Sequence, residues 1–158
     1  MSDDNTCGYR FGPVAENVDA VCGKPADVVD RGDGTYLCRE HAGAIREEQP
    51  ERRFKQVDRT YDRLIAENLF GKRVCEKDSH EDCPASNTHM PLQEVPWFAE
   101  RPEEADRVVE RLREGGIDLR AGGIAPRLPG HWQYVFTNPE NEPLAVCVAA
   151  LSARGVEF

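Results

Sequence analysis

Four residues in the first third of the chain have the side chains and the spacing of a metal site. They follow the pattern Cys7-x14-Cys22-x15-Cys38-x2-His41. Zinc prefers four thiolate and imidazole ligands in a closed tetrahedron. Because Cys38 and His41 are three residues apart, the first turn of a helix can direct both side chains at one ion. We therefore expect one Zn2+ with a structural role, since protein ligands would fill every coordination position.

The segments around three of these ligands resemble treble-clef zinc modules. Cys22-Gly23-Lys24-Pro25-Ala26 has the form of a zinc knuckle, and Tyr36-Leu37-Cys38-Arg39-Glu40-His41-Ala42 places two ligands where a helix would begin. The resemblance covers about a quarter of the chain and implies a knuckle, a hairpin and a helix that supplies the last two ligands. The sequence departs from the pattern at Cys7, which lies far from Cys22 instead of two residues before it.

Two other interpretations of these cysteines are open: unligated thiols in a flexible segment, or a disulfide pair. Residues 7–44 contain few large apolar side chains, too few for a core of their own, and such a segment usually needs a metal to fold. The first six residues lack the basic and apolar regions of a secretory signal. We therefore expect a cytoplasmic protein, in which thiols stay reduced.

A second candidate zinc site follows the pattern Cys75-x4-His80-x2-Cys83-x5-His89. The ligand types suit zinc, but the spacing matches no zinc family closely, and an ordinary exposed loop is the alternative. A catalytic cysteine–histidine pair is a further alternative. Four carboxylates lie among these residues, and negative charge disfavours the thiolate that a nucleophile needs.

Charge and hydropathy limit the function classes. The net charge of the 158-residue chain is −9, so the protein as a whole would repel nucleic acid. Residues 46–73 differ, with eight basic and six acidic side chains. No apolar run approaches the ~20 residues that a membrane-spanning helix needs, and we expect no membrane partner.

The predicted elements divide the chain into three parts. In residues 1–50, two short strands at 26–30 and 35–37 are joined by a turn at 31–34, and a helix runs from Cys38 to about residue 48. Residues 51–73 form a linking amphipathic helix. Its basic side chains lie near one stripe, for which a solvated face is the simplest interpretation: Arg52, Lys55, Arg59 and Arg63.

Residues 74–158 read as a small α+β domain, which makes the whole chain α+β. Residues 101–115 predict a helix that begins near Pro102, ends at Gly115 and buries Ala105, Val108, Val109 and Leu112. Residues 117–119 predict a strand, and 91–97 a strand or an extended segment. Residues 131–137 and 144–151 predict an antiparallel hairpin, with Cys147 in the core.

Three functions are compatible with these features. The leading hypothesis is a zinc-stabilised interaction or regulatory protein that binds another macromolecule, with a protein as the expected partner. The first alternative is a nucleic-acid-binding zinc protein that uses the basic stripe. The second is an enzyme with its site in the loop from Cys75 to His89. Trp97, and Trp132 beside His131, would anchor an interface if exposed, and belong to the core if buried.

Overall fold

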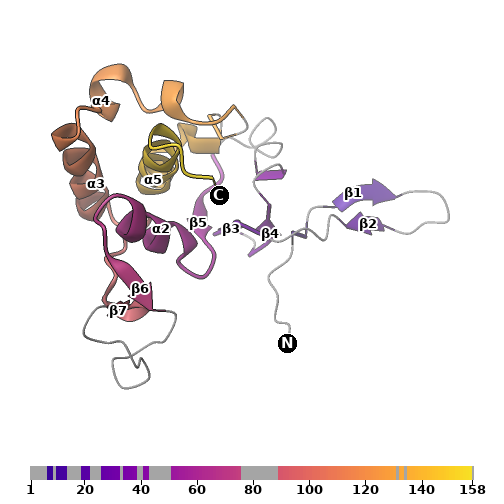
Figure 1. Cartoon of the computed structure of the whole chain (residues 1–158). Helices are drawn as coiled ribbons and strands as arrows, with labels where there is room; N and C mark the ends of the chain where they lie inside the picture. Colours follow the sequence, from indigo (N-terminus) through magenta and orange to yellow (C-terminus); the bar gives the residue numbers. More distant parts are fainter. Residues whose placement is uncertain are drawn as a thin grey trace.

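The computed structural model shows an α+β chain, as predicted, with its short strands between residues 10 and 91 and its longer helices from residue 60 onward (Figure 1). It describes residues 7–8, 10–13, 19–21, 26–32, 34–38, 41–42, 51–75, 89–130, 132–133 and 135–157. Among the helices of these residues, none is both long enough and apolar enough to cross a membrane.

The predicted hairpin in the first part is confirmed. Strands β3 (Val28–Asp30) and β4 (Tyr36–Leu37) are antiparallel, with Val28 opposite Leu37. Their turn is closed by the amide of Gly34, which donates to the carbonyl of Asp30 at 2.8 Å. Gly34 has a φ of 75°, a conformation that a residue without a Cβ adopts without strain.

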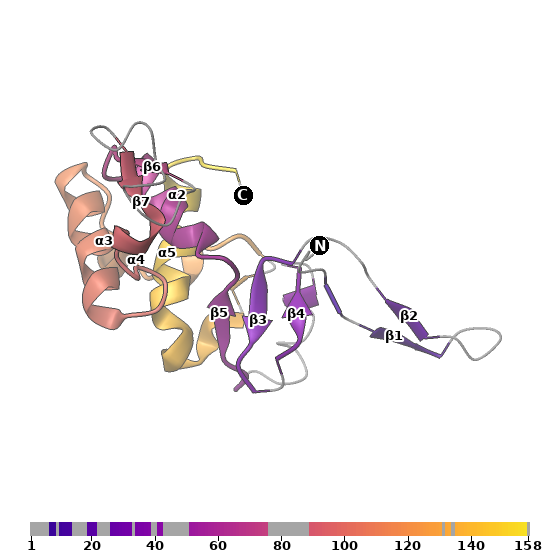
Figure 2. The same ribbon diagram turned by 90° about the horizontal axis from the view of Figure 1, so that it is seen from below.

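The linking segment 51–73 is not helical throughout, and that prediction is wrong. Residues Phe54–Gln56 form β5, which pairs with β3 and completes a sheet of order β4-β3-β5 (Figure 2). Asp58 and Arg59 then have positive φ values of 53° and 56°, and helix α2 (Thr60–Asn68) begins only after them. The apolar residues Phe54 and Val57 are three positions apart, a spacing that fits one face of a helix. In the structure Phe54 and Gln56 are buried, which is the two-residue period of a strand.

Two further strand pairs complete the β structure. The antiparallel hairpin of β1 (Arg10–Pro13) and β2 (Asp19–Val21) projects away from the helices (Figures 1 and 2). Strands β6 (Arg73–Cys75) and β7 (His89–Pro91) are parallel. A 3-10 turn at Leu92–Glu94 follows β7, so the predicted strand or extended segment at 91–97 is only partly extended.

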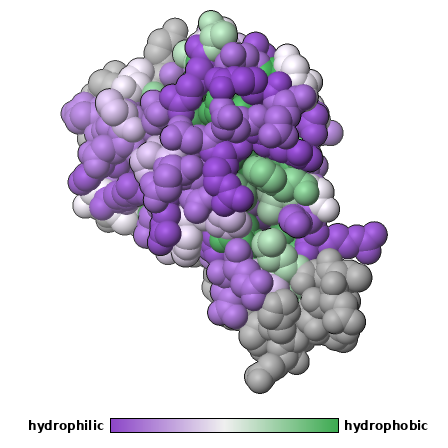
Figure 3. All heavy atoms as spheres, turned by 90° about the vertical axis from the view of Figure 1, so that its left-hand side faces the viewer, coloured by the Kyte–Doolittle hydropathy of each residue, from purple (hydrophilic) through white to green (hydrophobic). Residues whose placement is uncertain are grey.

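Helix α3 (Pro102–Glu114) agrees with its prediction, from the proline in the first turn to the end at Gly115. It buries the four predicted side chains, Ala105, Val108, Val109 and Leu112. On its exposed side, charged residues pair one turn apart, as in Arg113–Glu110 at 2.6 Å and Arg107–Glu104 at 3.0 Å. Hydrophilic residues accordingly cover most of this side of the molecule (Figure 3).

The predicted antiparallel hairpin at 131–151 is wrong, because its second half is helix α5 (Glu142–Ala153) and Val135–Thr137 is a 3-10 turn. Every residue from Pro143 to Leu151 is buried. A continuous apolar run suits a helix that is covered on all sides as well as it suits a buried strand. Three alanines within this run and a proline in its first turn favour the helix.

The strand predicted at 117–119 is also wrong. Asp118 instead caps helix α4 (Leu119–Gly122), with its side chain accepting hydrogen bonds from the amides of Arg120 and Ala121. These bonds, that of Ala121 above all, lower the pKa of Asp118.

One apolar core extends from the first part of the chain to the last. It contains Cys7 and Leu37 from the N-terminal part together with Tyr61, Trp132 and α5. Trp132 is fully buried and stacks on Phe136 with ring centroids 5.0 Å apart. The division of the chain at residues 50 and 73 stays a prediction, although β5 pairs with β3 across the first of these boundaries.

A buried ion pair ties the segment after β7 to α2. The Arg59 side chain donates to Asp62 Oδ2 at 3.0 Å and to the carbonyls of Leu92, Val95 and Pro96. Asp62 is fully buried and also accepts from the amide of Ala99 at 2.8 Å. Desolvation raises the pKa of Asp62 from 3.8 to about 6, although the Ala99 amide and Arg59 both act to lower it.

The raised pKa predicts a pH dependence that Asp62→Asn removes. A carboxyl group that binds its proton more tightly in the folded state stabilises the fold fully below about pH 3.8, and loses that contribution as the pH rises through about 6. The unfolding free energy of the wild type minus that of Asp62→Asn should therefore fall by about 3 kcal/mol between pH 3.5 and pH 7. Urea denaturation of both proteins across this range measures it. A difference that stays constant with pH would show that the ion pair offsets desolvation, and one that rises with pH would show that the ion pair outweighs it; either result would contradict the raised pKa.

Candidate metal centre

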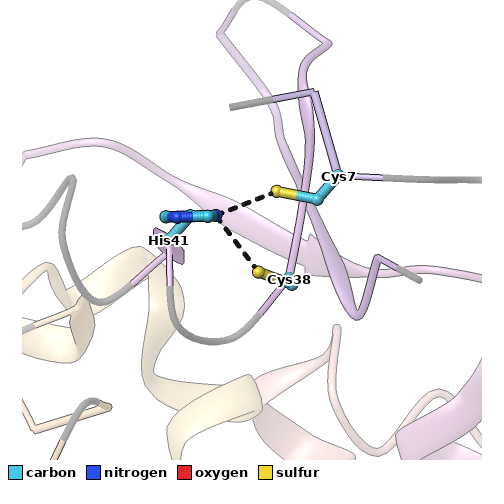
Figure 4. A group of neighbouring side chains, drawn as sticks. All are labelled: Cys7, Cys38 and His41. Atoms are coloured by element: carbon cyan, nitrogen blue, oxygen red, sulfur yellow. Dashed lines mark hydrogen bonds between the residues drawn. The ribbon is translucent and has the colours of Figure 1, made fainter. Parts of the chain in front are cut away.

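Three of the four predicted zinc ligands lie together. The Nδ1 atom of His41 is 3.3 Å from the Sγ atom of Cys7 and 3.3 Å from that of Cys38 (Figure 4). Among the described residues, these side chains form a group whose three ligand atoms all lie within 4.8 Å of one another. Both cysteines are buried, with exposed fractions of 0% and 4%, whereas His41 is partly exposed.

The donor set and its spacing fit a metal ion. Two sulfurs and one imidazole nitrogen are ligands that zinc prefers. Bonds of ~2.3 Å to sulfur and ~2.0–2.1 Å to nitrogen at tetrahedral angles place a sulfur and a nitrogen ligand roughly 3.6 Å apart. The observed separations of 3.3 Å are close to that value. The three side chains can therefore bind one ion with only small movements.

Cys38 and His41 are positioned by the strand that precedes them and by a helical turn. Cys38 directly follows β4, whose Leu37 carbonyl accepts from the amide of Asp27 at 2.9 Å. The amide of Ala42 donates to the carbonyl of Cys38 at 2.9 Å, a helical bond that spans the two ligands. The predicted helix over 38–48 is thus helical at residues 41–42, and residues 39–40 and 43–50 lie outside the described part of the chain.

Cys7 is brought to the same place by its neighbour Gly8. The Gly8 amide donates to the carbonyl of Tyr36 at 2.6 Å, which holds the Cys7–Gly8 segment beside β4. Gly8 was not identified from the sequence as a residue that positions a metal ligand. The signal was present, because Cys7-Gly8 repeats the Cys22-Gly23 pair on which the knuckle interpretation rests.

Cys22, the fourth predicted ligand, lies outside the described residues. The strand register nonetheless shows where the chain runs just before it. Val21 lies opposite Arg10, so β1 and β2 return the chain to a point three residues beyond Cys7. The long separation between Cys7 and Cys22 in the sequence is therefore largely spanned by one hairpin.

The second candidate site stays a prediction, because only Cys75 and His89 of its four residues belong to the described part of the chain. Cys75 is buried at the end of β6, opposite Pro91, and His89 lies opposite Arg73 in β7. His80 and Cys83 lie outside the described residues. Among the residues that the structure does describe, no group of three metal-binding side chains includes Cys75.

Cys147 is a core residue, as predicted, although it lies in α5 and not in a strand. It is fully buried. Burial raises the pKa of its thiol well above the usual range, and the nearby carboxylates of Asp62 and Glu100 raise it further. This thiol is therefore unsuited to nucleophilic chemistry.

Comparison of the chain with models of protein families, with curated proteins and with solved structures finds no match.

Because the Gly8 amide holds Cys7 beside β4, two substitutions of Gly8 should affect metal affinity differently. A Cβ at this position would meet its nearest neighbours at 3.6 and 3.7 Å, which are ordinary contacts, so Gly8→Ala should leave metal affinity unchanged. Gly8→Pro removes the amide that bonds to Tyr36, and the loss of one such hydrogen bond should weaken metal affinity roughly two- to tenfold.

Competition of each variant with a zinc-binding dye, followed by absorbance, measures the effect. Equal affinities for the alanine and proline variants would show that the Gly8–Tyr36 bond does not position Cys7.

Proposed function

We propose that this chain is a zinc-stabilised interaction or regulatory protein that acts by binding another macromolecule. The observation that carries the proposal is the convergence of Cys7, Cys38 and His41 on one point. Two thiolates beside an imidazole favour zinc over the hard cations, which prefer oxygen ligands.

Cys22 is the fourth ligand in this proposal. A closed zinc site needs four ligands, and three come from the described residues. The pairing of Val21 with Arg10 supports Cys22, because it returns the chain toward Cys7 directly before the cysteine. A hairpin of β3 and β4 followed by a helical turn with two ligands also agrees with the treble-clef resemblance.

The metal is structural in this proposal. Both cysteine ligands are buried, and they belong to the same apolar core as Val28 and Leu37. With four protein ligands, no coordination position is left for a substrate. The ion would link segments whose strands are only two to four residues long and whose sequence contains few large apolar side chains.

Two exposed aromatic side chains and the net charge support a protein as the partner. Tyr36 is 40% exposed and Trp97 is 38% exposed, and aromatic residues often dominate binding energy at interfaces. The Arg59 guanidinium lies 3.8 Å from the ring centroid of Trp97 and helps to fix the indole. Trp132, by contrast, is fully buried and serves the core. A net charge of −9 favours a basic partner surface.

The nucleic-acid alternative relied on the stripe of Arg52, Lys55, Arg59 and Arg63, and at least two of these residues pair with carboxylates of the protein itself. Arg52 pairs with the buried Asp30, and Arg59 pairs with the buried Asp62. A stripe in which at least two of the charges are neutralised in this way is a poor match for a phosphate backbone. The enzyme alternative, with its site between Cys75 and His89, stays a prediction.

Photo-crosslinking inside cells tests the interaction. A benzoylphenylalanine at position 97 keeps an aromatic ring beside Arg59, and the same residue at position 107, an exposed site on α3, is the matched control. We expect a discrete protein adduct from position 97 and none from position 107. The adduct should disappear when Cys38→Ala removes a zinc ligand.

Adducts with nucleic acid, or the same adduct from both positions, would contradict a protein partner at Trp97.

A further inference from the structure

Asn141 occupies an unusual position between the sheet and helix α5. It is the residue that precedes α5, a place where asparagine ordinarily caps the helix with its side chain. Here the side chain makes no such capping bond. It is fully buried, so its polar atoms must find partners elsewhere.

Those partners lie in β5, in the residues just before β5, and in the 3-10 turn at Val135–Thr137. The Oδ1 atom accepts from the amide of Phe54 at 2.7 Å, and the Nδ2 atom donates to the carbonyl of Arg52 at 2.9 Å. The same Nδ2 atom donates to the carbonyl of Val135 at 3.2 Å. One side chain therefore holds the outer edge of β5 and the beginning of the helical part together.

The candidate metal centre lies at the other edge of the sheet, beside β4. Cys38 directly follows Leu37 of β4, Leu37 lies opposite Val28 of β3, and Val28 lies opposite Gln56 of β5. Val28 and Leu37 are both fully buried. A continuous row of paired, buried residues thus leads from the metal ligands to the strand that Asn141 holds.

We infer that Asn141 couples metal binding at Cys7, Cys38 and His41 to the packing of the N-terminal end of α5. The inference rests on the proposed function, in that the group at this site is a metal ion. A bound ion holds β4 in place. Because β4 pairs with β3 and β3 pairs with β5, the position of β5 beside Asn141 is then fixed as well. Coupling is reciprocal: if metal binding favours the packed arrangement around Asn141, then loss of that packing weakens metal binding.

Metal affinity in Asn141→Ala tests the coupling directly. Wild type, Asn141→Ala and Val109→Ala, all without a histidine tag, are titrated with Zn2+ against a competing dye. Val109 is buried on α3, which packs mainly against α5, so its substitution by alanine weakens the packing of the helices at a residue outside the sheet. We expect Asn141→Ala to lose at least about fivefold in zinc affinity, the lower end of typical coupling, and Val109→Ala to lose none.

The inference would be overturned if both variants lost zinc affinity equally, or if neither variant lost any. If the wild type itself binds no zinc, the proposed function fails instead.

If Asn141→Ala does not fold, the coupling is tested with a second variant, Asn141→Asp, and with the fluorescence of Trp132. The aspartate keeps an acceptor for the Phe54 amide and loses both donated bonds. In a Trp97→Phe background, Trp132 reports on the turn that Asn141 holds, because it stacks on Phe136. Removal of zinc with a chelator should shift its emission when Asn141 is present, and the shift should be smaller in the Asn141→Asp variant. Identical shifts in the two proteins, or none in either, would contradict the coupling.

Discussion

Strands of two or three residues cannot sustain a sheet, and the first third of this protein depends on what holds the edges of β3, β4 and β5. Small sheets need a hydrophobic face or an external constraint, since few hydrogen bonds oppose the entropy of ordering the chain. At one edge the constraint is the group of Cys7, Cys38 and His41. At the other it is Asn141 and the buried helix α5. The sheet is the part that joins these two constraints.

Buried polar side chains connect separate segments of this structure through hydrogen bonds. Asn141 joins β5 to α5, and Arg59 with Asp62 joins the segment after β7 to α2. Such groups cost desolvation energy, as the raised pKa of Asp62 shows, and each is compensated by several hydrogen bonds with defined directions. Apolar packing alone would allow neighbouring arrangements of these segments. The directional bonds favour one of them.

The parts of the fold that were predictable carry complete local signals. Helix α3 has a proline at its start, glycines at its end and one apolar side, and the β3–β4 hairpin has glycine in its turn. The apolar run of α5 was ambiguous, because a segment buried on every side shows no period. Strand β5 was missed because its pairing with β3 comes from residues more than twenty positions earlier in the chain.

The metal site was predictable in its residue types, and only partly in its geometry. Cysteine and histidine spacing indicated Cys38 and His41 as a pair, since a helical turn joins them. The approach of Cys7 depends on the hydrogen bond between Gly8 and Tyr36, which are distant in the chain. Asn141 carried no sequence signal of its role, because an asparagine before a helix ordinarily indicates a cap.

We propose that one zinc ion joins four protein ligands at the edge of the sheet. X-ray absorption at the zinc edge, combined with elemental analysis of the tag-free protein, would measure the number of zinc ions and the identity of their ligands. We expect one zinc per chain, coordinated by three sulfur atoms and one nitrogen atom, from Cys7, Cys22, Cys38 and His41. Protein that retains no zinc, or zinc bound mainly by oxygen atoms, would contradict it.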